Sequence, residues 1–196
     1  MLVQRSKRGG ANIMNFTKEE VEKILLGEKT QCRCLVKEGE KFYLEEFTLT
    51  ASPLTTVINM NGGVKWQVGK DYAVCPGRGK RGLLYCPKCY SISAYSKEVW
   101  CAIKKNHKEE IKMKPLRVVI KSIRKEKLLD ISESDAKKEG YKNCINFVEN
   151  FAGLNAKHLP KEIKNLNGMI YPSLKKLELW NPFVWVLEFS IMGGNK

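Results

Sequence analysis

The sequence has no long apolar run and very little histidine. No apolar stretch approaches the roughly 20 residues that a membrane-spanning helix needs, so we expect no membrane partner. Residues 1–12 are basic and no apolar segment follows them, which is not the pattern of a secretory signal. The two histidines, His107 and His158, are isolated from each other, so no Ser-His-Asp catalytic triad is indicated.

Acidic residues are also scarce relative to basic ones. Lys and Arg total 35 against 21 Asp and Glu, which gives a net charge of +14. Such an excess favours nucleic acid as a partner, because each neutralised phosphate releases counterions. The alternative is a basic surface that only keeps the protein in solution. Seven cysteines without a signal peptide indicate a reducing compartment, and hence thiols or metal ligands. We therefore expect a cytoplasmic protein.

One short helix is predicted near the N-terminus, and strands follow it. Thr17 and Glu20 have the spacing of a capping box, and Gly27 suits the left-handed end of a helix. Residues 132–139 and 145–152 also have helical patterns, each with a glycine after it. Strand patterns cover residues 30–36, 41–50, 54–60, 64–68, 71–75, 116–124 and 183–191.

The segment after the first helix carries a resemblance to a known family. Residues 27–33 (GEKTQCR) are joined by three later stretches, 66–74 (WQVGKDYAV), 123–132 (IRKEKLLDIS) and 181–189 (NPFVWVLEF). Together these blocks are similar to the ASCH domain, a branch of the PUA-like β-barrels, as found in proteins of tailed bacteriophages. The resemblance implies an α+β fold, a PUA-like and mostly antiparallel β-barrel with short flanking helices. It also implies the cytoplasm of a bacterium or of a phage-infected host cell.

The same resemblance divides the chain. We expect residues 1–13 to be a disordered basic tail, and residues 14–82 and 115–192 to form the barrel. Residues 83–114 would be a cysteine-rich insertion, because the phage relatives pass almost directly from the preceding glycine–arginine turn to the next strand.

Lys29, Cys32 and Glu139 are the candidate catalytic residues. In ASCH proteins that hydrolyse N4-acetylcytidine, a lysine is the base, a threonine three places later is the nucleophile, and a glutamate donates a proton. Lys29 matches the lysine, Cys32 stands at the threonine position, and Glu139 is the best match for the glutamate. The resemblance thus implies an amidohydrolase, with a ribonuclease as a further alternative. The simpler hypothesis is that Lys29 and Arg33 hold a phosphate or a base while Cys32 is packed inside, as free cysteines commonly are.

Residues 77–82 (GRGKRG) form a basic, glycine-rich turn that lacks the spacing of a Walker loop. Glycine lets backbone N–H groups approach an anion, and we expect this turn to hold phosphate beside the helix end. A solvated basic loop is the alternative. The predicted nucleic-acid-binding residues are Lys29, Thr30, Arg33, Arg78, Lys80 and Arg81.

Cys86-Pro87-Lys88-Cys89 resembles a zinc knuckle. A structural zinc site needs four ligands, and Cys101 is the predicted third. His107 is the predicted fourth, and Cys75 is the alternative to it. We expect structural zinc here, and a hairpin without metal is the alternative.

These features predict a module that binds RNA or a modified nucleotide in the cleft of an ASCH-like barrel. The amidohydrolase is the alternative from a different functional class. A third hypothesis is a phage accessory protein that recognises a protein partner.

Overall fold

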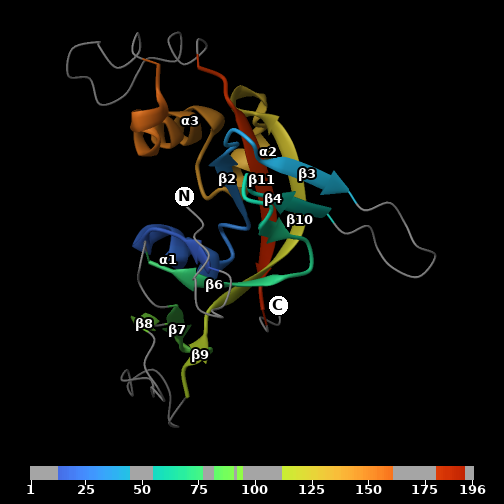
Figure 1. Cartoon of the computed structure of the whole chain (residues 1–196). Coiled ribbons are helices and arrows are strands. Elements are labelled where there is room, and N and C mark those ends of the chain that lie inside the picture. The colour runs from blue at the N-terminus through green and yellow to red at the C-terminus, as the bar shows by residue number, and fades with distance from the viewer. Residues whose placement is uncertain are drawn as a thin grey trace.

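The computed structural model describes residues 13–44, 55–76, 82–90, 92–94, 112–160 and 180–192. They form a mixed α+β fold with mostly antiparallel sheets (Figure 1). The helices are α1 (Lys18–Leu26), α2 (Glu133–Lys138) and α3 (Cys144–Leu154). The strands are β1 (Ile13–Asn15), β2 (Gln31–Leu35), β3 (Lys41–Leu44), β4 (Thr55–Ile58), β5 (Val64–Gln67), β6 (Asp71–Cys75), β7 (Leu83–Tyr85), β8 (Ile92–Ala94), β9 (Lys114–Pro115), β10 (Arg117–Lys127) and β11 (Phe183–Ile191).

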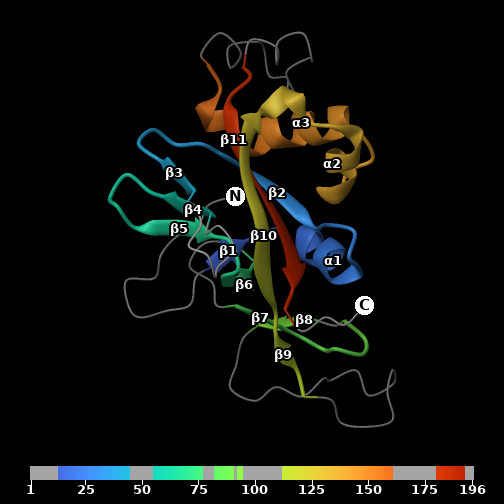
Figure 2. The same cartoon turned by 90° about the vertical axis from the view of Figure 1, so that its right-hand side faces the viewer.

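The strands make three sheets. The largest has five strands in the order β1-β6-β10-β11-β2, and its pairs are antiparallel except for β1 with β6. The sheets β3-β4-β5 and β8-β7-β9 have three strands each. In Figure 2, β10 and β11 run through the middle of the molecule, with the three helices on one side and β3-β4-β5 on the other.

Strand β11 lies between the two main clusters of the hydrophobic core. Trp185 and Leu187 belong to the larger cluster, which includes α1 and the inner faces of β6 and β10. Val184 and Val186 belong to the second cluster, which lies under α2 and α3. Alternate residues of a strand point to opposite faces, so β11 is apolar on both faces from Val184 to Leu187, where it contacts both clusters. The prediction of a central strand over 183–191 is confirmed.

The predicted start and end of α1 are confirmed. Thr17 Oγ1 accepts from Glu20 N at 3.2 Å, and Thr17 N donates to Glu20 Oε2 at 2.8 Å, which completes the capping box. Gly27 ends the helix in the left-handed region at φ +76°. Strand β6 and the β4–β5 hairpin also lie where the sequence predicts them.

Three expectations are changed. Helix α3 continues through Gly153 to Leu154 and ends at Asn155, so the predicted stop at Gly153 is wrong. Strand β10 extends three residues beyond the predicted end at Arg124, because its pairing with β11 continues to Lys127 and Phe183. Strand β1 was not predicted, and it pairs in parallel with β6 through the buried Met14.

The described strands show three separate sheets and no closed barrel, so the coarse α+β class is confirmed and the PUA-like barrel is not. Residues 1–12 of the predicted tail lie outside the described residues. The sheet β8-β7-β9 comes from the predicted insertion, and Leu83 and Tyr85 of β7 pack into the larger core cluster. Among the described helices, none has both the length and the apolar character needed to cross a membrane.

Substitution of Gly140, which directly follows Glu139, tests how closely this end of α2 packs against Lys23. Its φ is +82°, and an added Cβ would lie 2.8 Å from Lys23 Cδ, whereas Gly62, at φ +72°, has open space around it. We expect Gly62→Ala to lower the free energy of unfolding by about 1 kcal/mol, the cost of the left-handed region alone. Gly140→Ala should cost about 2 kcal/mol, because the Lys23 side chain must also move. Urea denaturation measures both, and equal losses would contradict a close contact between Lys23 and Gly140.

Candidate functional site

The turn from α1 to β2 is fixed by backbone hydrogen bonds. Lys29 N donates to Lys23 O at 3.1 Å, and Thr30 N donates to Lys138 O at 2.8 Å. Thr30 O accepts from Phe189 N of β11 at 2.9 Å. Lys29 and Glu139 pair as an isolated antiparallel bridge. Thr30 therefore contributes its backbone to the site, while its side chain is exposed.

The Lys29 ammonium is buried, with a residue exposure of 2 %, and its partners are two glutamates. Nζ donates to Glu139 Oε2 at 2.9 Å and to the Glu139 carbonyl oxygen at 3.0 Å. Glu20 Oε1 lies 3.4 Å away, beyond an ordinary hydrogen bond for this type of pair. An ammonium carries three N–H groups, so two of them are well bonded and the third has only a long contact.

The charge of Lys29 is stabilised. Burial lowers the pKa of its ammonium, but the negative charges of Glu139 and Glu20 outweigh this effect and leave the pKa above its ordinary value. Lys29 is therefore protonated at neutral pH. In this arrangement it is a hydrogen-bond donor and a fixed positive charge, not a base.

Arg33 is held by three carboxylates. Its Nη1 donates to Glu139 Oε1 at 3.1 Å, and its Nη2 donates to Asp135 Oδ2 at 3.0 Å and to Glu126 Oε1 at 2.5 Å. The guanidinium also lies over the Phe147 ring, 5.4 Å from its centroid. Most of its donors are thus already used, and its predicted role as a phosphate ligand is not supported by this geometry.

Neighbouring polar side chains extend this ion-pair network. Arg124 Nη2 donates to Asp135 Oδ2 at 2.5 Å, and Arg124 Nε donates to Glu126 Oε2 at 3.0 Å. The buried Gln31 amide, oriented so that its oxygen faces Arg33, accepts from Arg33 Nη1 at 2.7 Å and donates to Asp135 Oδ1 at 3.2 Å. These partners come from β2, β10 and α2, so the network joins the sheet to the helix that Glu139 directly follows.

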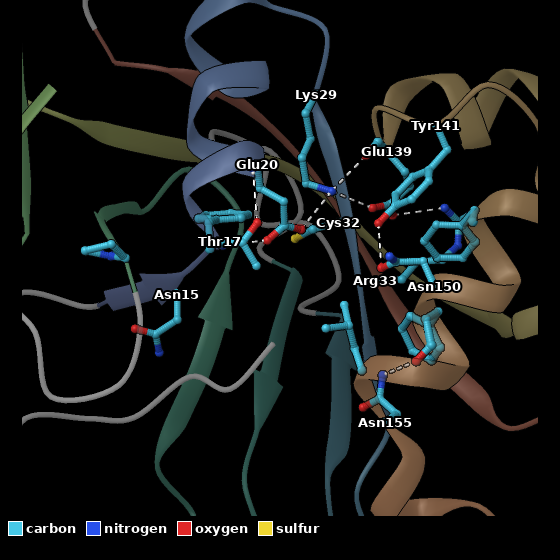
Figure 3. A pocket seen from close by; sticks show the side chains of 15 residues that line it. Asn15, Thr17, Glu20, Lys29, Cys32, Arg33, Glu139, Tyr141, Asn150 and Asn155 are labelled. Carbon is cyan, nitrogen blue, oxygen red and sulfur yellow. Dashed lines mark hydrogen bonds and ion pairs between the residues drawn. The ribbon is translucent and has the colours of Figure 1, made fainter. Parts of the chain in front are cut away.

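A cavity of about 280 Å³ lies between α1 and α3, and Lys29, Cys32, Arg33 and Glu139 all line it. The structure therefore brings the three candidate catalytic residues to one cavity. Figure 3 shows Lys29 between two groups of polar side chains, which are Asn15, Thr17 and Glu20 on one side and Tyr141, Asn150 and Asn155 on the other. Phe16, Phe147 and Phe151 supply aromatic surface.

The cavity contains residues that the sequence did not predict as site residues. Glu20 was predicted only as a capping residue, yet its second carboxylate oxygen faces Lys29. Tyr141 donates from its hydroxyl to Asn150 Oδ1 at 2.8 Å, and burial raises the pKa of Tyr141 to about 12, so the hydroxyl stays protonated. Tyr141 and Asn150 belong to no sequence motif that would mark them as site residues. Glu20 has one sequence signal, which is its position three residues after the helix cap.

Cys32 lines the cavity but is poorly suited to nucleophilic attack. Burial raises the pKa of its thiol well above the ordinary value, and contact with Cys34 adds to this shift. The thiolate is the reactive form of cysteine. The protonated Lys29 opposes the shift but does not reverse it. The geometry therefore favours the hypothesis in which Cys32 is packed inside.

The basic turn is described only at its ends. Pro76, which directly precedes the turn in the sequence, lines the cavity. Arg78, Lys80 and Arg81 lie outside the described residues, and their phosphate-binding role stays a prediction.

Two of the predicted zinc ligands are described. Cys86 and Cys89 flank the turn after β7, where Tyr90 N donates to Cys86 O at 2.9 Å, and Cys86 is buried. Cys101 and His107 lie outside the described residues. Within the described ranges no three His, Cys, Asp or Glu side chains are grouped to hold a metal, so zinc stays a prediction.

Comparison with known proteins gave no relative, since no family model, curated protein or solved structure matches the chain. The ASCH resemblance therefore stays a prediction.

Glu139 is the carboxylate shared by Lys29 and Arg33, and its removal tests the network. We expect Glu139→Gln to lower the free energy of unfolding by about 3 kcal/mol, because two buried cations lose a partner. The matched control is Glu188→Gln, which removes a partly exposed carboxylate bonded to Lys138 and Ser122. The control should cost less than about 1 kcal/mol. Urea denaturation compares the two, and a loss from Glu139→Gln no larger than the control would show that the buried pair does not stabilise the fold.

Proposed function

We propose that this chain binds a nucleotide and holds its base, a cytosine, in the cavity between α1 and α3. The observation that carries the proposal is the buried Lys29 ammonium, which keeps one N–H without a good acceptor in the lining of a cavity. A polar group that is buried without a full set of hydrogen bonds is costly. A ligand with an acceptor at this point would supply the missing bond.

The donors and acceptors of the cavity fit the edge of cytosine. Lys29 would donate toward a ring nitrogen or carbonyl, and Glu20 Oε1, which has only the long contact with Lys29, would accept from the exocyclic amino group. Acidic side chains accept from this amino group in nucleic-acid recognition. Glu139 uses two of the roughly four acceptor sites of its carboxylate for Lys29 and Arg33, so it also retains acceptor capacity.

The size and the walls of the cavity suit one flat ring. Cavities for drug-sized ligands measure roughly 300–1,000 Å³, and this one measures about 280 Å³. Aromatic residues line it on the α1 side (Phe16) and on the α3 side (Phe147 and Phe151). Aromatic rings stack on bases without regard to their sequence, so these walls would bind the base and the polar groups would select it.

Charge balance places the phosphate outside the cavity in this proposal. Two glutamates and two basic residues line it, and a phosphate there would meet the carboxylates directly. The proposed phosphate site is the basic turn that begins after Pro76, with Arg78, Lys80 and Arg81. A PUA-like barrel, in which the described sheets would join, is the proposed architecture around this cleft.

The second candidate function is the amidohydrolase, favoured by the meeting of Lys29, Cys32 and Glu139 at one cavity. In that reaction the lysine must accept a proton and the thiol must lose one. Both pKa values are raised, that of Lys29 by the glutamates against the effect of burial and that of Cys32 by burial, and both shifts oppose these steps. Binding without reaction is therefore the better-supported function, and ribonuclease activity has no separate observation in its favour.

We expect cytidine to bind about tenfold more tightly than uridine, because uridine presents a carbonyl oxygen where Glu20 needs a hydrogen-bond donor. Isothermal titration calorimetry with the full chain measures both. Glu20→Gln should abolish this preference, because the capping box uses the single amide oxygen of glutamine and its NH2 group, a donor, then faces the base. Glutamine at this position still completes a capping box, so the helix is preserved. Glu22→Gln, on the exposed face of the same helix, is the control and should keep the full preference.

The outcomes separate the two candidate functions. If the wild-type chain binds neither cytidine nor uridine, the proposal is wrong. If it releases acetate from N4-acetylcytidine, and Cys32→Ala abolishes the release, the amidohydrolase is correct and binding is only its first step.

For the hairpin after β7 we propose a structural zinc ion held by Cys86, Cys89, Cys101 and His107. Cysteine thiolates and histidine in this number are a common structural zinc set. Elemental analysis of the purified full chain should give about one zinc per chain, and Cys86→Ser should abolish it. His107→Ala and Cys75→Ser decide which residue is the fourth ligand. Cys144→Ser, whose thiol donates to Ile131 O, is the control, and a metal-free wild-type chain would contradict the proposal.

A further inference from the structure

A second cavity, of about 440 Å³, adjoins the first. It lies between the end of α3, the segment after β2, strand β5 and residues 180–182. Leu154 and Asn155 line both cavities. The two cavities therefore share a wall at the end of α3.

Strand β2 forms a second common boundary. Cys32 lines the first cavity and Cys34 lines the second. Residues two apart on a strand point to the same face and lie roughly 7 Å apart along it, a distance that one sugar–phosphate unit can span. A ligand with its base in the first cavity would reach the second through its backbone.

The second cavity contains a hydrogen-bond donor without an acceptor. Trp66 lines the cavity, the residue is 1 % exposed, and its Nε1 has no hydrogen-bond partner among the described residues. By contrast, Trp185 Nε1, equally buried, donates to Glu40 Oε2 at 2.8 Å. Buried indole N–H groups usually have a partner, so an oxygen acceptor from a ligand would satisfy Trp66.

The charges of the two cavities differ. The first has two acidic and two basic residues, whereas the second is lined by three lysines, one histidine and a single glutamate. One of these lysines, Lys65, is paired with Glu40 at 2.6 Å. Lys37 is exposed at the rim. The second cavity therefore favours an anion, which the first does not.

We infer that the second cavity binds the phosphate and the adjoining nucleotide of a single-stranded chain whose neighbouring base occupies the first cavity. This inference rests on the proposed function, since it extends the same ligand by one unit. The ligand class becomes a single-stranded oligonucleotide of at least two residues rather than a free nucleoside. An accessible base inside such a strand has a phosphate on each side, and the second cavity would receive one of them.

The test compares cytidine, 3′-CMP, 5′-CMP and the dinucleotide CpC on the full wild-type chain by calorimetry. We expect CpC to bind about tenfold more tightly than either monophosphate, because the second nucleotide adds contacts of its own. Trp66→Phe keeps the ring and removes the N–H, so it should cancel most of this gain and leave cytidine binding within about twofold of wild type. Lys37→Met should reduce the gain by about threefold. Lys121→Met, an exposed lysine on β10 that lines neither cavity, should change nothing.

The outcomes of this comparison are interpreted as follows. If cytidine binds but CpC binds no better than the monophosphates, the inference is wrong and the proposed function stands. The inference is also wrong if the gain exists but Trp66→Phe and Lys37→Met leave it intact. Where CpC gives no gain over the monophosphates, a monophosphate that binds more tightly than cytidine would show that the second cavity holds phosphate without the adjoining nucleotide. If no compound in the series binds, the proposed function and the inference both fail.

Discussion

The buried ion pair between Lys29 and Glu139 is the contact on which the site depends. It joins the turn after α1 to the end of α2, two segments separated by 110 positions in the sequence. Breaking such a pair leaves an uncompensated charge inside the protein. The surrounding structure therefore has to fix both ends, and it does so with the Thr17–Glu20 cap and Gly27 before Lys29, and with the Ser132 cap and Gly140 around Glu139.

Local features of the sequence predicted much of this arrangement. The capping box, the left-handed Gly27 and the start of β11, which is apolar on both faces, each depend on residues close in sequence, and each is confirmed. Features that depend on distant partners were not predicted. Strand β1 needs β6 beside it, and the partners of Arg33 come from β10 and α2. The predicted stop of α3 at Gly153 is wrong for a different reason. Glycine has a low helix propensity, but the packing of Phe151 and Ala152 in the second core cluster keeps α3 helical through this residue.

The net charge of the chain and the ion pairs at the first cavity lead to different conclusions about where an anion can bind. The chain as a whole carries +14, which favours a polyanion, yet the basic residues at the first cavity are paired with carboxylates. A guanidinium that is already bonded to three carboxylates has little left for a phosphate. Net charge therefore predicts a class of partner, whereas the pairing of individual side chains supports the proposal for which part of a nucleotide each cavity would bind.

The same pairing underlies the proposal that the site recognises a ligand and does not transform it. Two glutamates that hold a lysine in place also hold its proton, since each stabilises the charged form. A buried thiol beside them stays neutral, because its charged form would be surrounded by apolar core and by further negative charge. Using this lysine as a base would require removing the carboxylates that position it. A donor that keeps its proton at neutral pH but has one hydrogen bond to give is better suited to selecting a ligand than to transforming it.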